Sequence, residues 1–555
     1  MTLDVGSFPI LTVTTFTPLV GALIVAASPA RYARALALAA SLVAWVVSLL
    51  LLIGFDPHSS RLFQFREQAS WIPAFGIEYH LGVDGLSLIL VVLTTTLTWI
   101  SILASFSPIK DRIKEYMISF LVLEVGMIGV FVALDTFLFY IFWEIVLVPM
   151  YLIIGIWGGA NRIYATIKFV LYTLVGSLLM LVAILTTAFA FQAAHNGNWT
   201  GAFDFEQLRT FGFDPTLQLF AFLAFFLAFA IKVPMFPFHT WLPDAHVQAP
   251  TAGSVILAAI MLKLGAYGLI RFTLPLFPAA AHTFAPAIIV LSLIAILYGA
   301  VVALVQPDLK KLVAYSSVSH MGFVTLGIFV FNVQGMDGAI LQMVNHGLIT
   351  GALFLLVGVI YERTHDRTIA KMGGAASVMP IWAVALGFFC FASGGLPGLS
   401  GFVGEFLVLV GAFQFSPWVA GLATICMVLA AAYLLWMYQR IIFGELSEFF
   451  RGLGHHLTDM SATEILTLAP LGALTVVFGL FPGLVLDLVG RSVTTVLADV
   501  GRQGAVVVPP QAALIAIALP ILYVVARLIW VARIDLGGGG RADRGDVTVV
   551  PESAS

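Results

Sequence analysis

The chain has 555 residues, of which 61% are hydrophobic and 10% are charged, and its mean hydropathy is +1.04. No water-soluble fold could expose so apolar a composition, so the sequence indicates a polytopic membrane protein. The net charge of −3 says little about partners, and we expect no nucleic acid among them. Its two cysteines, Cys390 and Cys426, lie in apolar runs, which argues against a disulfide framework or an iron–sulfur cluster. We therefore expect no redox centre, cofactor or metal in this chain.

Apolar runs of about 20 residues, the length that crosses about 30 Å of hydrocarbon, recur along the chain. The first run lacks a basic flank and a small-residue cleavage site, so we expect it to remain as a span. The pattern predicts an all-α polytopic membrane protein with about 14 to 15 transmembrane helices. The predicted spans are residues 9–27, 35–54, 85–106, 116–133, 136–156, 163–191, 216–244 (broken), 252–272, 285–305, 310–331, 337–361, 378–413 (broken), 418–442, 463–487 and 511–532.

Lysine and arginine residues fall mainly in alternate connections, 16 on one side against 6 on the other. Because basic residues favour the cytoplasmic side, we expect the N-terminus outside and the C-terminus in the cytoplasm. The cytoplasmic set includes Lys310 and Lys371. The outer set is Arg61, Arg66, Arg209, Arg271, Arg491 and Arg502, and the remaining cations, Lys168, Lys232, Lys263 and Arg527, lie inside predicted spans.

One of the two predicted helix breaks follows Lys232, in the segment FAIKVPMFPFHTWLPD. Pro234 and Pro237 each remove an amide donor and clash with the preceding turn, so the helix should break there. The freed backbone groups need protein or a wet cavity, and broken membrane helices are typical of ion or substrate sites. Lys232 could instead extend to the membrane surface, but the neighbouring prolines favour burial at the break.

A weak internal repeat relates the two breaks. FFLAFAIKVP (225–234) matches FFCFASGGLP (388–397) and pairs Lys232 with Gly395, while two further segment pairs follow in the same order, one of them pairing Tyr267 with Tyr433. The sequence therefore predicts two inverted five-helix repeats, an architecture typical of transporters. The predicted domains are N-terminal helices (1–115), a first repeat (116–272, broken near 232–238), a second repeat (285–442, broken near 393–401), C-terminal helices (443–533) and a disordered cytoplasmic tail (534–555).

Besides Lys232, four charged residues inside the predicted spans stand out as candidates, because a charge there is costly unless it faces protein or water. Glu144 and Lys263 lie too deep to reach the membrane surface easily, and Glu405 follows the second, Gly/Pro-rich break. Glu124 is as readily a structural partner as a functional group. Burial disfavours the charged forms of lysine and glutamate, whereas proximity favours the charged pair, so moving such a pair apart can release or take up a proton.

Histidines are less decisive, because two ordinary hydrogen bonds can satisfy a neutral imidazole. His320 and His346 lie in mid-span among hydroxyl and amide residues, and each is as readily a core histidine as a proton carrier. His239 and His246 flank the first break and are better explained as loop or structural residues. A haem ligated by two histidines is a weaker alternative, because nothing in the sequence makes them face each other.

Three segments resemble the antiporter-like subunits of respiratory complex I and of multi-subunit sodium/proton antiporters. They are KVPMFPFHTWLPDAHVQAPTAGSVILAAIMLKLGAYGLIR (232–271), QPDLKKLVAYSSVSHMG (306–322) and GLPGLSGFVGEF (395–406), and the likeness extends over about 110–445. A glutamate at Glu405 is typical of one complex I chain of this family, whereas its sister subunits L and N usually carry lysine there. The predicted span 511–532 exceeds the fourteen helices of the family core.

The resemblance implies a role for each buried polar residue. Glu144 and Lys232 would form a charge pair that responds to neighbouring subunits, and Lys263 would relay the proton. His320 and His346 would continue the polar path across the middle of the membrane to Glu405, the terminal carrier toward the outer side. Glu124 and His239 are weaker candidates for the same path, and waters would bridge the gaps.

The function so implied is proton translocation in the membrane arm of NADH:quinone oxidoreductase, driven by redox chemistry elsewhere. FMN, iron–sulfur clusters and quinone would then belong to partner subunits. The expected partners are the antiporter-like L and N neighbours and lipids, in a hetero-oligomer of the bacterial plasma membrane. The alternatives are a sodium/proton antiporter subunit, a non-conducting scaffold of a membrane complex, and an independent permease for an organic solute.

Overall fold

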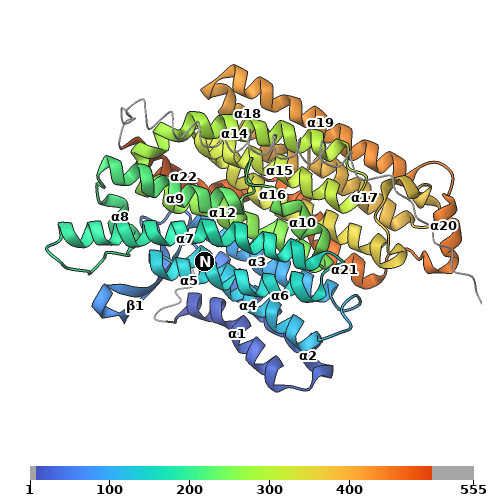
Figure 1. The fold of residues 1–555 in the computed structure, drawn as a ribbon, viewed down its shortest axis with the longest axis horizontal. Helices are drawn as coiled ribbons and strands as arrows, with labels where there is room; N and C mark the ends of the chain where they lie inside the picture. Colours follow the sequence, from blue (N-terminus) through green and yellow to red (C-terminus); the bar gives the residue numbers. More distant parts are fainter. Residues whose placement is uncertain (1–7, 503–555) are drawn as a thin grey trace, which may run out of the picture. The chain divides into compact units, whose positions relative to one another are not determined.

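The computed structural model describes residues 8–502, so the predicted span 511–532 and the predicted tail 534–555 lie outside the described residues. Within them, 13 helices are long and apolar enough to cross a membrane. Two shorter apolar helices, α17 (Pro380–Ser393) and α18 (Ser400–Phe415), together form the second predicted broken span. The prediction of an all-α polytopic membrane protein is confirmed, with one small antiparallel sheet added (Figure 1).

The helices follow the predicted spans closely. In chain order they are α1 (Ile10–Ala27), α2 (Ala33–Gly54), α3 (Gly85–Ala104), α4 (Ile113–Val132), α5 (Thr136–Ile145), α6 (Leu147–Trp157), α7 (Arg162–Ala194), α8 (Phe205–Thr210), α9 (Pro215–Lys232), α10 (Trp241–Gln248), α11 (Thr251–Ile256), α12 (Leu262–Gly268), α13 (Leu274–Leu276), α14 (Pro278–Leu304), α15 (Leu309–Phe329), α16 (Val333–Thr364), α17, α18, α19 (Pro417–Ile442), α20 (Glu448–Leu453), α21 (Ala462–Leu480) and α22 (Gly483–Gly501). The relation between the two predicted repeats stays a prediction.

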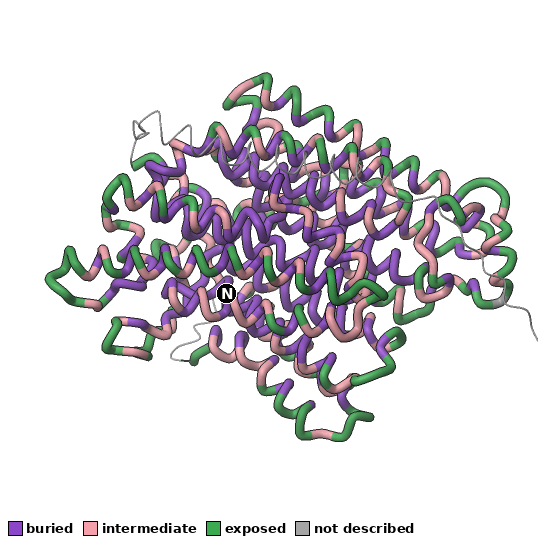
Figure 2. Tube along the Cα trace, viewed as in Figure 1, coloured by how far each residue is buried: buried purple, intermediate pink, exposed green. Residues whose placement is uncertain are grey.

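The helices divide into an inner and an outer group. The continuous helix over 251–276 and α16 are buried along their whole hydrophobic length, and α3 and α15 nearly so. By contrast, most residues of α2, α19 and α21 are only partly buried or exposed, as in lipid-facing or partner-facing helices (Figure 2). Polar side chains on the inner helices must therefore find partners within the protein.

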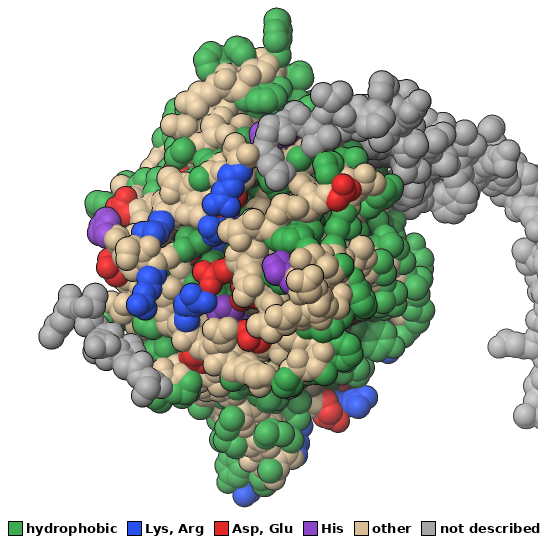
Figure 3. Space-filling model, turned by 90° about the vertical axis from the view of Figure 1, so that its left-hand side faces the viewer, with side chains coloured by type: hydrophobic (Ala, Val, Ile, Leu, Met, Phe, Trp, Pro, Cys, Tyr) green, Lys and Arg blue, Asp and Glu red, His purple; other side chains and the backbone are tan. Residues whose placement is uncertain are grey.

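The strands β1 (Gln64–Ile72) and β2 (Ile77–Val83) pair in an antiparallel hairpin within the predicted outer connection 55–84. Glu67 of β1 caps α1, accepting hydrogen bonds from the amides of Leu11 (2.7 Å) and Thr12 (3.0 Å). The hairpin and α8 lie at one end of the helices and α20 at the other (Figure 1). Viewed from the hairpin end, charged side chains gather in the central part of the face, and apolar ones dominate its sides (Figure 3).

The predicted span 463–487 was too long. The helix α21 ends at Leu480, and a second helix, α22, begins at Gly483 beyond Pro482. Val485, Val489, Val493 and Val496 of α22 are buried, at intervals of three and four residues. This spacing gives one apolar face, so α22 is an amphipathic helix that packs against α3 and α16.

The assignment of Arg271 to an outer connection was also wrong. The helix that begins at Thr251 continues to Leu276, so Arg271 lies inside it and is 2% exposed. Its guanidinium pairs with Asp84, which also accepts the amide of Ser87 (2.9 Å) and so caps α3. Arg271 Nε also donates to the hydroxyl of Tyr267 (3.2 Å). Burial of the Arg271 guanidinium is tolerated because its charge is paired and hydrogen-bonded.

Replacing Asp84 with alanine should therefore leave the buried Arg271 without its charge partner and remove the cap of α3. We expect a loss of about 3–5 kcal/mol in stability, measured as thermal unfolding of the purified chain or as its yield in membranes. The control is Glu115→Ala, because Glu115 pairs with Arg112 at the surface (3.4 Å, both about half exposed) and should cost about 0–1 kcal/mol. Equal effects of the two variants would contradict this account.

Candidate functional site

The first predicted break lies where expected. The helix α9 ends at Lys232, and α10 begins at Trp241 after the two prolines. The backbone groups freed by the break are satisfied within the protein: the Met235 amide donates to the Ala230 carbonyl (2.8 Å), and the Trp241 indole donates to the Ile231 carbonyl (2.9 Å). A broken helix at membrane depth is stable only with such partners.

Lys232 is 1% exposed and lies between two aromatic rings, with Nζ 5.2 Å from the Trp143 ring centre and 5.7 Å from that of Phe169. Glu144 follows Trp143 on α5 and is close enough to interact electrostatically with Lys232. Glu144 and Lys232 do not form an ion pair with each other in the described part of the chain, residues 8–502. The two charges are therefore near each other without direct contact. Their action as a charge pair stays a prediction.

Gly265 lets the helix bearing Lys263 approach the helix bearing Lys232. A Cβ atom at Gly265 would lie 2.7 Å from the Phe229 carbonyl oxygen and 3.0 Å from the Lys232 Cβ. The first of these atoms is backbone and cannot rotate away. Close approach of α12 to α9 therefore requires glycine at this position.

Lys263 is fully buried and lies two residues after the end of a π-helical segment over Leu257–Met261. Its Nζ donates to the Ala258 carbonyl (2.6 Å) and lies 2.6 Å from His346 Nδ1 of α16. A π segment changes the i→i−4 pattern of backbone bonds, and such segments are frequent at functional sites. The arrangement places an ammonium group directly against an imidazole that can accept its proton.

The polar line continues from His346 toward the second break. The rings of His346 and His320 have centres 6.1 Å apart, and His320 Nδ1 lies 2.5 Å from Glu405 Oε1. Both histidines and Glu405 are 2–3% exposed. Lys263, His346, His320 and Glu405 thus form one buried row across α12, α16, α15 and α18, and we call it the central line.

Three polar residues that the sequence did not single out as candidates contact the central line. Gln342 donates to Glu405 Oε1 (2.9 Å), and the hydroxyls of Ser393 and Tyr433 each lie 3.3 Å from His320 Nε2. Only Tyr433 had a usable signal, through its pairing with Tyr267 in the internal repeat. Gln342 and Ser393 could not be found by spacing, because their partners come from other helices.

The second break also lies where predicted. The helix α17 ends at Ser393 and α18 begins at Ser400, and Gly395 (φ +79°) and Gly398 (φ +94°) between them adopt left-handed backbone that favours glycine. Asn345 of α16 donates to the Ser400 carbonyl (2.5 Å) and so holds the start of α18 beside the central line.

Other candidate residues lie outside the central line. Glu124 is fully buried on α4, and neither carboxylate oxygen has a hydrogen-bond partner among the described residues. His239 is buried beside the rings of Phe236 (5.7 Å) and Tyr298 (5.0 Å).

His246, which the sequence left as a structural residue, is buried and stacks on Phe354 (4.5 Å between ring centres). It lies close enough to Lys310 and Lys263 to interact electrostatically with both. Lys310, assigned to a cytoplasmic connection, is 5% exposed and donates to the Ala249 carbonyl (2.6 Å) at the start of α15.

Two broken helices beside a buried row of exchangeable groups define a membrane transport protein of the antiporter-like class. A model of the family "NADH:quinone oxidoreductase/Mrp antiporter, TM" matches residues 133–430. The chain is 51% identical to NADH-quinone oxidoreductase subunit M of Rhodobacter capsulatus, over 89% of this chain and 98% of that protein. The chain therefore belongs to this family, in its subunit M branch.

Solved structures agree with this assignment. A chain of respiratory complex I from Thermus thermophilus, solved with bound NADH, has a TM-score of 0.79 at 32% identity, with coverage of 88% of this chain and 100% of that one. A chain of the Mrp complex from Dietzia sp. DQ12-45-1b has a TM-score of 0.76 at 20% identity, covering 89% and 100%. The second likeness shows the shared fold alone.

Replacing Gly265 with alanine should push α12 away from α9, because the added Cβ would meet the Phe229 carbonyl. We expect a loss of about 1–3 kcal/mol in stability, measured by thermal unfolding in detergent. The matched control is Gly421→Ala on α19, where an added Cβ meets nothing within 4 Å and stability should be unchanged or slightly higher. A neutral Gly265→Ala variant would show that the helices do not depend on this contact.

Proposed function

We propose that this chain is a proton-translocating subunit in the membrane arm of a respiratory NADH:quinone oxidoreductase. The central line supports the proposal most strongly, because it joins an ammonium, two imidazoles and a carboxyl group within the buried helices. Among the relatives named above, the Rhodobacter capsulatus protein is a subunit of that enzyme, and the Thermus thermophilus chain belongs to its structure. In this proposal FMN, iron–sulfur clusters and quinone belong to partner subunits, and Lys263, His346, His320 and Glu405 carry protons.

The first half of the mechanism concerns the lysines. Protonated Lys263 can pass its proton to His346, whose Nδ1 lies 2.6 Å from its Nζ. In the proposed mechanism the field of Lys232 acts on the charge state of Lys263, and Glu144 modulates that field. Two unit charges about 4 Å apart interact with about 4 kcal/mol at an effective dielectric of 20, enough to shift a proton equilibrium by roughly three orders of magnitude. A small movement of Glu144 toward Lys232 would therefore change the proton affinity of Lys263.

The second half runs from His346 to Glu405. His346 and His320, with ring centres 6.1 Å apart, share no hydrogen bond among the described residues, which suits a bridging water, whereas His320 can deliver a proton directly to Glu405 at 2.5 Å. Gln342, Ser393 and Tyr433 orient the last pair. Glu405 would release the proton toward the outer side, with the N-terminus outside, the C-terminus in the cytoplasm and subunits L and N as neighbours in the bacterial plasma membrane.

A sodium/proton antiporter subunit is the second candidate, and the fold likeness to the Mrp complex favours it as an alternative. The two candidates differ in their partners. Purification of the assembled complex in mild detergent should yield NADH-oxidising subunits with flavin and iron–sulfur clusters. Partners without any redox cofactor, together with sodium-dependent proton exchange, would support the antiporter and overturn the proposal.

The substitution Lys263→Met should remove the first proton carrier while leaving assembly intact. We expect NADH-driven proton translocation by the assembled complex in membrane vesicles to fall by about tenfold or more, because a proton carrier has no substitute in a buried row. The control is Lys311→Met at the start of α15, where Lys311 is partly exposed and lies outside the central line. Full coupled translocation by the Lys263→Met variant would favour a scaffold role.

A further inference from the structure

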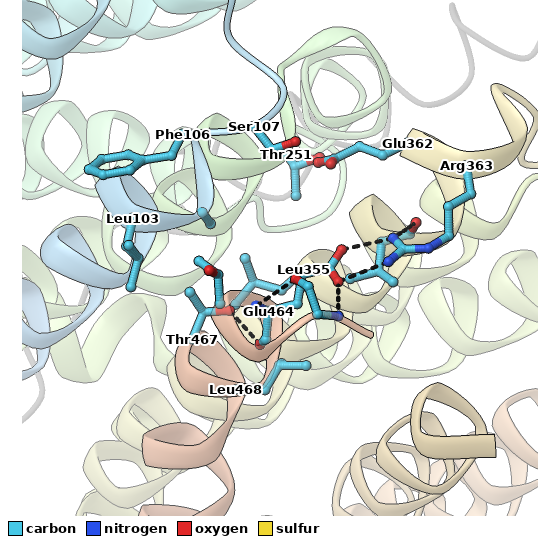
Figure 4. A pocket seen from close by; sticks show the side chains of 14 residues that line it. Leu103, Phe106, Ser107, Thr251, Leu355, Glu362, Arg363, Glu464, Thr467 and Leu468 are labelled. Atoms are coloured by element: carbon cyan, nitrogen blue, oxygen red, sulfur yellow. Dashed lines mark hydrogen bonds and ion pairs between the residues drawn. The ribbon is translucent and has the colours of Figure 1, made fainter. Parts of the chain in front are cut away.

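A second site lies away from the central line, at the end of the molecule predicted to face the cytoplasm. A cavity of about 440 Å³ opens between the end of α3, the end of α16 and the start of α21. Apolar groups, among them Leu103, Phe106 and Leu355, line part of its wall, and charged and hydroxyl groups line the rest (Figure 4). Such a wall suits a molecule with both a polar and an apolar part.

The one arginine of the cavity wall is fully used by the protein. Arg363 Nε donates to the Thr458 carbonyl (2.6 Å), Nη1 to the Val359 carbonyl (2.9 Å) and to Glu464 (2.8 Å), and Nη2 to the Asp459 carbonyl (3.0 Å) and to Glu464 (2.9 Å). A guanidinium has five N–H donors, and these five bonds account for all of them. Arg363 therefore has no donor left for an anionic ligand.

Glu362 is the remaining charged group of the wall. It is partly buried, and its carboxylate makes no hydrogen bond or ion pair with any residue within 8–502. Ser107 and Thr251 line the cavity near it (Figure 4). With Arg363 and Glu464 neutralising each other, Glu362 in its ionised form gives the wall one net negative charge beside hydroxyl groups. The cavity therefore complements a small cation that donates hydrogen bonds.

An apolar groove adjoins this cavity. It encloses about 670 Å³ between α17 and α21 and shares Leu468 with the cavity wall. Val384, Phe388, Gly472 and Val476 lie along it, and on α21 it extends from the first turn to Val476, about one turn before the helix ends. The groove has the length and apolar surface that a hydrocarbon chain requires.

We propose that the cavity and groove together bind one aminophospholipid, with its ammonium group at Glu362, its phosphate accepting hydrogen bonds from hydroxyl groups of the wall instead of from Arg363, and an acyl chain between α17 and α21. A primary ammonium donates three hydrogen bonds, which Glu362 and the neighbouring hydroxyls can accept. A trimethylammonium headgroup donates none and is held best by several aromatic faces, whereas Phe106 is the one aromatic side chain in the described wall of the cavity. The site thus selects phosphatidylethanolamine, and it stands independently of the proton-transfer function.

Photolabelling of the assembled complex in its native membrane tests this proposal. The probes are a phosphatidylethanolamine and a phosphatidylglycerol that carry the same photoreactive group on the acyl chain. We expect the phosphatidylethanolamine probe to label peptides of α17 and α21 several-fold more than the phosphatidylglycerol probe does. The variant Glu362→Gln should abolish that preference, and Gly472→Phe, which fills the groove, should lower labelling by phosphatidylethanolamine.

The matched control is Glu448→Gln on α20, an exposed carboxylate on the same predicted side and outside the cavity wall. It should leave the preference unchanged. Equal labelling by the two probes, or a preference that persists in Glu362→Gln, would overturn the proposal. So would carbodiimide cross-linking of Glu362 to a lysine of a neighbouring subunit, because a protein amine would then occupy the cavity. Assembly of each variant is checked by the NADH dehydrogenase activity of the purified complex.

Discussion

The structure depends on the cost of placing positive charge inside the membrane. Lys263 is fully buried, and no ion pair within residues 8–502 includes it; its partners are a backbone carbonyl and an imidazole. A charge in such surroundings is held only weakly in its ionised state, so modest changes in the local field can remove or restore its proton. Arg271, on the same helix, shows the opposite solution, because Asp84 neutralises it in a fixed pair. One buried cation can exchange a proton and the other stabilises the fold.

Much of the local structure follows from this cost. The two helix breaks and the π segment before Lys263 release backbone groups that other helices must satisfy, and Trp241 and Asn345 do so through side-chain hydrogen bonds. Polar partners are therefore concentrated on the inner helices, while the outer helices present apolar residues. The aminophospholipid proposed beside α21 would lie at the boundary between these two environments, at the level of the headgroups.

The sequence predicted the features that are energetically costly within a single segment of the chain. Prolines beside Lys232 and glycines near Gly395 locate the two breaks, and the described spans lie close to their predicted ranges. Features that depend on contacts between distant segments were not predictable. The helix α22 lacks the apolar length of a span, and Arg271 was placed outside because its partner Asp84 lies 187 residues away. The contacts of Gln342 and Ser393 with the central line were not predictable either, because their partners lie on other helices.

The proposed proton path depends on Glu405 receiving protons through His320. Its most direct test is the number of protons translocated per NADH oxidised by the assembled complex in liposomes, compared between wild type and Glu405→Gln. Glutamine keeps the size of the side chain and one acceptor oxygen but cannot exchange the proton. The account predicts a lower ratio for Glu405→Gln, with the NADH dehydrogenase activity of the partner subunits unchanged. A wild-type ratio at wild-type turnover would contradict it.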